Sequence, residues 1–235
     1  MDTKKYAILA FGGMGTRFGW IKPKQFYPIF GEKTIIEYLV EKFLSFDIFD
    51  EIVVISPSSY IEETKNILLK HLMMVSVVEG GDTRERSIWN GLSFLKSSAK
   101  EDDIVLIHDG ARPLVSKELI KANIDLCVNL GAVVTSVVST DTLSYSENGE
   151  SIDKVVDRNK IRLHQTPQTF KFGIVKTAME MNFQRLDTFS DDASVVLASG
   201  YKVYYIEGHR LNIKITTQDD LDILRYIISK GGRFV

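Results

Sequence analysis

The first residues with types and spacing suited to chemistry form a glycine-rich turn followed by two cations. They are, in chain order, Gly12, Gly13, Gly15, Arg17 and Lys24. Glycines let successive backbone N–H groups approach an anion closely, and arginine and lysine side chains pair with phosphate oxygens. The segment therefore predicts a phosphate-binding loop, with a solvated β-to-α turn as the alternative. No Gly-Lys-Ser/Thr sequence follows and the glycine spacing differs from the dinucleotide fingerprint, which disfavours a P-loop ATPase and a Rossmann dehydrogenase.

A second glycine turn lies at Gly80 and Gly81, within EGGDTRERSIWNGL. Asp82, Arg84 and Ser87 follow it at the expected start of a helix. Backbone groups and the Ser87 hydroxyl at this position are suited to reading the edge of a nucleotide base. Asp82 and Ser87 also have the residue types of helix caps, which is the alternative role.

An aspartate follows a buried-type apolar run in DIVLIHDGARP. Asp109 is the strongest metal-ligand candidate, because Mg²⁺ prefers one or two carboxylates together with ligand phosphates. Gly110 and Arg112 lie beside it at the expected mouth of the sheet. His108 is expected to make a structural hydrogen bond to a neighbouring turn, since the four histidines show no metal-ligand spacing.

Two further cations stand in polar patches of the C-terminal half. Arg158 lies in VDRNKIRLHQTPQTF and Lys214 in HRLNIKITT, with a third patch at SDDASVV. Lys214 alternates with isoleucines, so it is expected to project from the polar face of a strand. With Arg17 and Lys24, these cations would neutralise a nucleoside triphosphate and a second, phosphate-bearing substrate.

Elements that would position these residues can be predicted from apolar spacing. Short β-branched runs predict strands at residues 6–11, 51–56, 75–80, 103–108 and 132–138. Three-to-four-residue spacing predicts helices between them at residues 34–46, 59–72, 86–98 and 117–130. Strands that are apolar on both faces and alternate with helices indicate an α/β fold, a doubly wound, mostly parallel, Rossmann-like sheet. Its ligand should lie at the carboxyl ends of the strands.

The pattern changes between Ser139 and Leu163, where the sequence is polar and carries an Asn-Gly turn at residues 148–149. This predicts a β-hairpin arm at residues 139–163, projecting from a single domain of residues 1–235. Further helices are predicted at residues 172–183, 191–200 and 219–230, and further strands at residues 202–208 and 212–217.

Composition excludes several classes of protein. The chain has 235 residues, of which 44% are hydrophobic and 26% charged, as in ordinary globular proteins. Its formal charge of −2 offers no broad attraction to nucleic acid or to an anionic membrane. Cys127 lies in a helical pattern and is expected to be a buried hydrophobe. No apolar run approaches the roughly 18 residues of a membrane span, and the first is too short for a signal peptide, so a cytoplasmic location is expected.

The motifs GGMGTRFG, PKQF, GGDTRERSIWNGL, IHDGARP, DRN, QTPQTF, SDDAS and NIKITT, in that order, resemble those of the 2-C-methyl-D-erythritol 4-phosphate cytidylyltransferases of isoprenoid biosynthesis. They also resemble the related ribitol-5-phosphate cytidylyltransferases of teichoic-acid assembly. GGMGTRFG is closer to the ribitol branch, whereas the count of motifs favours the methylerythritol branch. The resemblance implies a CTP-dependent, Mg²⁺-requiring transferase that forms a homodimer through the arm. An inactive nucleotide-binding regulatory protein with the same fold is a third possibility.

The resemblance also implies roles for individual residues. It assigns transition-state stabilisation to Arg17 and Lys24, and positioning of the sugar phosphate to Arg158 and Lys214. The implied nucleotide-binding residues are Ala10, Phe11, Gly12, Gly13, Gly15, Gly80, Gly81, Asp82, Arg84, Ser87, Asp109 and Gly110. The implied acceptor-binding residues are Arg112, Thr142 and Thr166, and Asp109 lies near the metal ion. Phe11 stands where relatives carry a small residue, so its ring is expected to crowd or reshape the nucleotide site.

Overall fold

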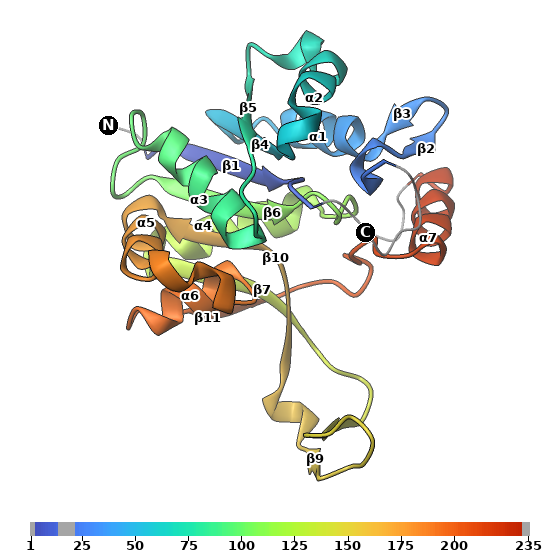
Figure 1. Ribbon diagram of the computed structural model, residues 1–235, viewed down its shortest axis with the longest axis vertical. Coiled ribbons are helices and arrows are strands. Elements are labelled where there is room, and N and C mark those ends of the chain that lie inside the picture. Colours follow the sequence, from blue (N-terminus) through green and yellow to red (C-terminus); the bar gives the residue numbers. More distant parts are fainter. Residues whose placement is uncertain (1–2, 14–21, 232–235) are drawn as a thin grey trace.

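The computed structural model describes residues 3–13 and 22–231, and a seven-stranded sheet lies at its centre (Figure 1). The spatial order of the strands is β11-β7-β10-β6-β1-β4-β5. Their bounds are β1 (Lys5–Ala10), β4 (Glu51–Ser56), β5 (Val75–Glu79), β6 (Ile104–Asp109), β7 (Ala132–Val138), β10 (Arg162–Lys171) and β11 (Tyr204–Glu207). Neighbouring strands pair in parallel except for β10, which is antiparallel to both β6 and β7. The predicted mostly parallel α/β sheet is confirmed.

Helices cover both faces of this sheet because consecutive strand residues point to opposite sides. Leu9 of β1 joins one hydrophobic cluster and Ile8 joins the other. The first cluster takes apolar side chains from α1 (Ile35–Ser45), α4 (Lys117–Leu130) and α7 (Gln218–Ser229). The second takes them from α3 (Arg84–Leu95), α5 (Phe172–Met181) and α6 (Asp192–Ala198). The doubly wound arrangement is therefore observed directly.

Short elements complete the chain. Between β1 and α1 lie η2 (Lys24–Phe26), β2 (Pro28–Phe30) and β3 (Lys33–Thr34). The segment predicted as one helix at residues 59–72 divides into η3 (Ser58–Tyr60), α2 (Ile61–Ile67) and η4 (Leu69–His71), and η6 (Phe183–Thr188) follows α5. Side-chain N-caps fix where α1, α3, α4, α6 and α7 begin. They are Thr34, Thr83, Ser116, Asp191 and Thr217.

A hairpin arm leaves the sheet between β7 and β10 and hangs away from the sheet (Figure 1). It contains β8 (Leu143–Tyr145), β9 (Lys154–Val156) and η5 (Arg158–Lys160). The Asn148 side chain accepts hydrogen bonds from the N–H groups of Glu150 and Ser151, at 2.9 and 3.1 Å, which shapes the turn. Apolar side chains on or at the base of the arm are exposed to solvent: Tyr145, Ile152, Val155 and Leu163.

Two sequence predictions about strands are wrong or incomplete. Residues 212–217 form no strand, because their backbone is held by single contacts such as the hydrogen bond from the Ile215 N–H to the Ala111 carbonyl at 2.8 Å. Conversely, the ten-residue strand β10 was missed. It is polar and contains Pro167, and its pairing with β7 shifts register between His164 and Gln168, where proline has no N–H to donate.

Candidate active site

A cavity of about 630 Å³ lies at the carboxyl ends of β1, β4, β5 and β6. Its walls come from residues 10–13 after β1, 57–59 after β4, 79–84 after β5 and 109–111 after β6. Lys24, Gln25, Ser87 and Lys214 complete much of the lining. This is the position that a parallel α/β sheet predicts for its ligand. Most of the nucleotide-binding residues implied by the sequence resemblance therefore share one hollow.

The two glycine turns meet at the Ser87 hydroxyl. This hydroxyl donates to the Thr83 carbonyl at 2.7 Å and accepts the Gly81 N–H at 3.0 Å. A Cβ at Gly12 or Gly80 would lie only 2.9 or 3.1 Å from the same oxygen, so glycine permits the close approach. Thr83, and neither Asp82 nor Ser87, is the N-cap of α3. The Ser87 hydroxyl instead lies between the two glycine turns that form this wall of the cavity.

Two lysines from distant parts of the chain line this cavity. The Lys24 ammonium lies 2.6 Å from the Ile215 carbonyl, and the Lys214 ammonium lies 2.9 Å from Asp109 Oδ2. The segment carrying Lys214 is thereby tied to η2 and to the end of β6. Gly15 and Arg17, which belong to the same predicted phosphate loop, lie outside the described residues.

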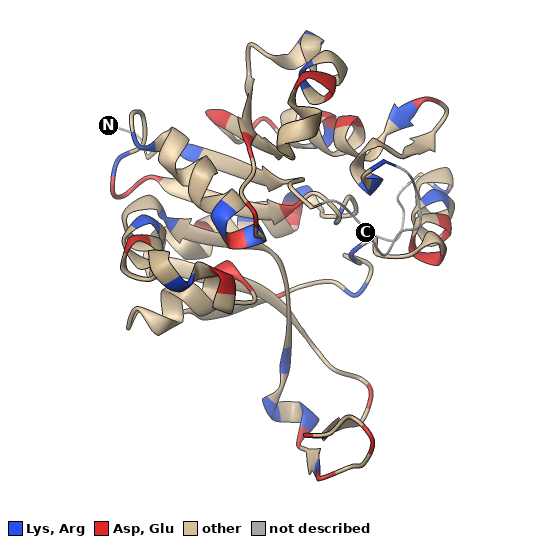
Figure 2. Ribbon diagram, in the orientation of Figure 1, with Lys and Arg blue, Asp and Glu red and all other residues tan. Residues whose placement is uncertain are grey.

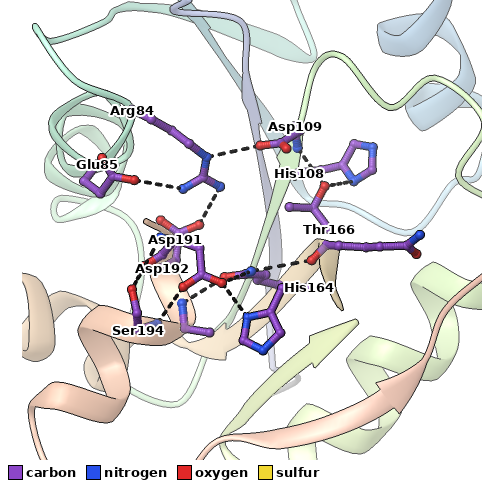
Figure 3. A network of polar contacts seen from close by, with 12 residues as sticks. Arg84, Glu85, His108, Asp109, His164, Thr166, Asp191, Asp192 and Ser194 are labelled. Atoms are coloured by element: carbon purple, nitrogen blue, oxygen red, sulfur yellow. Dashed lines mark hydrogen bonds and ion pairs between the residues drawn. The ribbon is translucent and has the colours of Figure 1, made fainter. Parts of the chain in front are cut away.

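Asp109 belongs to a buried ionic network, in which Arg84 bridges Asp109 and Asp192 (Figure 3). Arg84 Nε lies 3.1 Å from its Oδ1, and Lys214 and Arg112 contact its Oδ2 at 2.9 and 3.6 Å. Burial alone would raise the pKa of Asp109, but these positive charges outweigh it and hold that pKa well below its usual range. Arg84 also pairs with the fully buried Asp192 at 2.8 Å, a partner that the sequence analysis missed. The carboxylate of Asp109 is therefore ionised and fixed in direction.

A threonine hydrogen-bonds to the Asp109 backbone and contacts a buried histidine (Figure 3). The Thr166 hydroxyl accepts the Asp109 N–H at 3.0 Å and lies 3.1 Å from His108 Nδ1. His108 Nε2 donates to the Arg112 carbonyl at 2.9 Å. Burial lowers the pKa of His108 to about 4, so the ring is neutral at neutral pH. The predicted structural role of His108 is confirmed.

A second cavity of about 330 Å³ adjoins the first, because Arg84, Asp109 and Lys214 line both. Its other walls are Arg112, Arg162, His164, Gln165, Thr166, Gln168, Ser190 and Asp191. Arg112 and Thr166, which the resemblance implies as acceptor-binding residues, thus share this second cavity. The β10 residues and Asp191 were not singled out from sequence, although the motifs containing them were noticed.

Two predicted acceptor-site residues lie elsewhere in the single chain. Arg158 and Thr142 are on the exposed arm and line neither cavity. The Arg158 guanidinium donates instead to the Thr140 carbonyl at 2.6 Å. Within one copy, therefore, Lys24, Lys214 and Arg112 converge while Arg158 does not.

Phe11 lines the larger cavity, and its ring also crowds Gly110. Only 3% of the residue is exposed, and its ring packs in the core shared with α1 and α4. A Cβ at Gly110 would overlap this ring. The absence of a side chain at Gly110 therefore makes room for the phenylalanine, and the ring is fixed between the core and the Asp109 loop.

The residues present fit a Mg²⁺ ion that is held largely by its substrate. Within residues 3–13 and 22–231, no group of three or more His, Cys, Asp and Glu side chains is placed to hold a metal ion. Asp109 nevertheless supplies an ionised carboxylate to the wall shared by the two cavities. One carboxylate plus phosphate oxygens is a usual environment for Mg²⁺ in phosphate-transfer sites.

The carboxyl ends of the parallel strands carry two glycine turns, and cations from distant parts of the chain converge there. This fold and this site together define a nucleotidyltransferase. The sequence model of the 2-C-methyl-D-erythritol 4-phosphate cytidylyltransferase family (IspD) matches residues 6–230, and the chain belongs to this family. The protein of that name from Thermosipho africanus is 47% identical over 96% of this chain and 98% of its own. The crystal structure of the Francisella tularensis protein has a TM-score of 0.83, with 29% identity over 95% of this chain and 99% of its own. A 4-diphosphocytidyl-2C-methyl-D-erythritol synthase from Anaerococcus prevotii has a TM-score of 0.82, with 27% identity over 97% of this chain and 99% of its own.

Proposed function

We propose that the chain joins CTP and 2-C-methyl-D-erythritol 4-phosphate, releasing pyrophosphate and giving the CDP-polyol for isoprenoid biosynthesis. The family supports the substrates. The observation that carries the proposal structurally is the charged wall of Arg84, Asp109 and Lys214, which is common to two adjoining cavities. A triphosphate in the larger cavity and a phosphorylated acceptor in the smaller one would meet at this wall.

The reaction is an in-line displacement at the α-phosphorus of CTP. An oxygen of the acceptor phosphate attacks, and pyrophosphate leaves. The second pKa of a phosphate monoester is near 6, so the acceptor is mostly dianionic at neutral pH and needs no general base. This accords with a site in which the buried histidine, His108, is structural.

The chemical difficulty is repulsion between two anions, together with the negative charge that develops around the α-phosphorus. Lys24 lines the nucleotide cavity, and Arg112 lines the acceptor cavity with Lys214. Fixed cations in these positions hold the reactants together and stabilise the transition state. Arg17, predicted in the glycine loop, adds to this set. When bound, Mg²⁺ held by Asp109 and the triphosphate supplies further positive charge.

The working unit in this proposal is a homodimer. The arm exposes 56% of Tyr145 and 63% of Val155, apolar surface that a second copy would cover. Arg158 and Thr142 lie on the same arm, outside the cavities of their own chain. An arm reaching across the dimer would bring both residues to the acceptor cavity of the other copy, which is how we assign their predicted roles.

Membrane and nucleic-acid partners are not part of the proposal. In the portion of the chain that the structure describes, no helix combines the length and apolar character needed to cross a bilayer. The formal charge of −2 gives no broad attraction to a polyanion. A cytoplasmic location remains a prediction from the sequence.

Pyrophosphate release tests this function. The purified chain, with Mg²⁺, is assayed with CTP, UTP and ATP against 2-C-methyl-D-erythritol 4-phosphate and ribitol 5-phosphate. Release is expected with CTP and the methylerythritol acceptor at the highest kcat/KM. A preference for ribitol 5-phosphate would assign the chain to that reaction instead. CTP binding with no release across a panel of polyol phosphates would indicate an inactive nucleotide-binding protein.

A further inference from the structure

A histidine lies in the acceptor cavity at the base of the arm. His164 is on β10, beside the break in strand register, and lines the second cavity. Its Nδ1 lies 2.7 Å from Asp191 Oδ2 (Figure 3). About 37% of its side chain is exposed, so the ring is partly buried but accessible from the cavity.

The partner of His164 is itself held firmly. Asp191 caps α6, with its Oδ1 accepting the Ser194 N–H at 2.8 Å, and its Oδ2 accepts the Gln168 side-chain N–H at 2.9 Å. Burial would raise the pKa of Asp191, but its bonds to His164, Gln168 and Ser194 keep it well below the usual range. An ionised carboxylate in a fixed place makes Nδ1 of the histidine a donor and orients the ring. The structure shows no bond to Nε2 from any described residue.

The charges around His164 favour its protonated form. The hydrogen bond to Asp191 raises the pKa of His164, against the opposing effect of burial. Tyr205 of β11 packs against the ring at 5.8 Å between centroids. The nearest cation on the same strand, Arg162, is paired with Glu207 at 2.8 Å. His164 therefore lies beside the Asp191 carboxylate, while the Arg162 charge is neutralised by Glu207.

We propose that His164 is an acceptor-binding residue, whose Nε2–H donates to a phosphate oxygen of the acceptor, and that Asp191 is the residue that positions it. The assignment rests on the proposed transferase function. Arg112 and Lys214 line the same cavity but also contact Asp109, whereas the histidine contributes its charge from another element, β10, and does not contact Asp109. Cations held by different elements of one cavity restrain the acceptor phosphate at more than one point.

This role makes acceptor binding depend on pH in a defined direction. As the pH rises through the pKa of His164, the imidazolium loses its proton and the charge-assisted bond to the phosphate is lost. The KM for the acceptor rises accordingly, while the KM for CTP does not follow. The acceptor phosphate titrates near pH 6 itself. Its contribution is common to wild type and variants, so the comparison of their profiles isolates the histidine.

The experiment measures kcat and both KM values between pH 6 and 9 for four proteins. They are the wild type, His164→Asn, Asp191→Asn and, as a control, His71→Asn. His71 also faces a carboxylate, Glu41 at 3.4 Å, but lines neither cavity. His164→Asn keeps a neutral donor for Asp191, and Asp191→Asn keeps a helix cap without its charge.

We expect His164→Asn to raise the KM for 2-C-methyl-D-erythritol 4-phosphate about tenfold at pH 6.5, the size of one lost charge-assisted bond. The KM for CTP and kcat should stay within about twofold, and the difference from wild type should shrink as the pH rises. Asp191→Asn should move the rise in acceptor KM to lower pH. His71→Asn should match the wild type. The proposal would be overturned if His164→Asn changed the KM for CTP and the KM for the acceptor equally. It would also be overturned if the ratio of acceptor KM between variant and wild type stayed constant from pH 6 to 9.

A direct binding measurement separates this proposal from the function on which it rests. Calorimetric titration of 2-C-methyl-D-erythritol 4-phosphate into wild type and His164→Asn needs no turnover. If the wild type releases no pyrophosphate but binds the acceptor more tightly than the variant, the function fails and the role of His164 stands. Equal binding by the two proteins rejects the histidine even if turnover is normal, and no binding by the wild type rejects both.

Discussion

The nucleotide cavity and the acceptor cavity are built in different ways. Walls of the first are backbone turns tied to neighbouring strands, such as the Gly80 N–H to the Ser56 carbonyl at 2.8 Å and the Gly110 N–H to the Ala10 carbonyl at 2.9 Å. Walls of the second are mostly long polar side chains from β10, the start of α6 and the segment carrying Lys214. One half of the site is therefore set by the sheet, and the other by side chains that lie at its edge.

The two halves of the site also differ in whether one chain supplies all the residues assigned to them. The nucleotide cavity is surrounded within one chain, apart from the predicted loop residues that lie outside the described ranges. The acceptor cavity lacks the two arm residues assigned to it, Arg158 and Thr142. The arm carries its own basic and acidic residues, away from the sheet (Figure 2). Changes in the first half should affect turnover with every acceptor, and changes in the second should affect acceptor use.

The largest effect is expected for Lys24→Ala in the nucleotide half. Its ammonium is preorganised by the Ile215 carbonyl and lines the nucleotide cavity. Loss of one preorganised donor to the transition state costs on the order of 3 kcal/mol, or roughly a hundredfold or more in kcat. Steady-state pyrophosphate release with saturating CTP and acceptor measures it. Lys22→Ala is the matched control, because Lys22 pairs with Glu63 on the surface and lines neither cavity.

Unfolding must be separated from lost chemistry in the Lys24 variant. The thermal midpoint should stay close to that of the wild type, since the hydrogen bond from the Lys24 ammonium to the Ile215 carbonyl is only partly buried. Near-normal turnover in a correctly folded Lys24→Ala protein would remove Lys24 from the reaction and break the distinction between the two halves.

A smaller and more selective effect is expected for Arg158→Ala. This change should raise the acceptor KM about tenfold or more through the loss of a charge-assisted phosphate contact, with little change in the KM for CTP. Arg162→Ala provides a comparison, since Arg162 lines the acceptor cavity of its own chain but is paired with Glu207. Impaired CTP use with unchanged acceptor dependence would reverse the assignment of Arg158.

Mixing subunits tests whether the arm acts across a dimer. In a mixed dimer of Lys24→Ala and Arg158→Ala chains, one site receives an intact Lys24 and an intact Arg158 only if the arm serves the other copy. Activity of the mixed, refolded proteins should then exceed that of either variant alone. If each arm served its own chain, every site would lack one residue, and mixing would restore nothing.

Much of this site could be predicted because its residues follow simple patterns. The glycine turns follow apolar strands and Asp109 is the last residue of one, and carboxyl ends of parallel strands gather at one edge. Helix α4 has the predicted bounds, Lys117–Leu130, because an apolar stripe lies between the N-cap Ser116 and the positive-φ Gly131. Local chemistry and sheet topology lead to the same result there.

What was missed depends on tertiary contacts. Asp192 is a buried carboxylate stabilised by Arg84 from another helix, and burial raises its pKa even so. In sequence it is simply the first acidic residue of a short helix. The strand β10 is polar because its side chains bond to loops around the acceptor cavity, as Gln165 does with the His209 carbonyl at 3.0 Å. Polar strands of this kind carry no hydrophobic period.

The smallest effect expected is on the fixed wall of the nucleotide half, in Gly110→Ala. The backbone of Gly110 does not have positive φ, so alanine suits its conformation, but the new methyl group would overlap the buried ring of Phe11. Such overpacking costs about 1–3 kcal/mol of unfolding free energy and displaces the loop that carries Asp109. Thermal unfolding should show a lower midpoint, and kcat should fall severalfold with either acceptor because the loop borders both cavities.

Replacing Phe11 with a smaller side chain tests whether its overlap with the new methyl group at residue 110 causes the loss of stability. Phe11→Leu combined with Gly110→Ala should recover part of the lost midpoint, because the overlap is relieved from the other side. Gly13→Ala is the stability control, since a Cβ there meets no atom of the described residues within 4 Å. If Gly110→Ala alone keeps the wild-type thermal midpoint, the loop at residue 110 can shift to accommodate the methyl group. The nucleotide half is then no more rigid than the acceptor half. If the double variant regains stability but not turnover, the position of Asp109 depends on more than this contact.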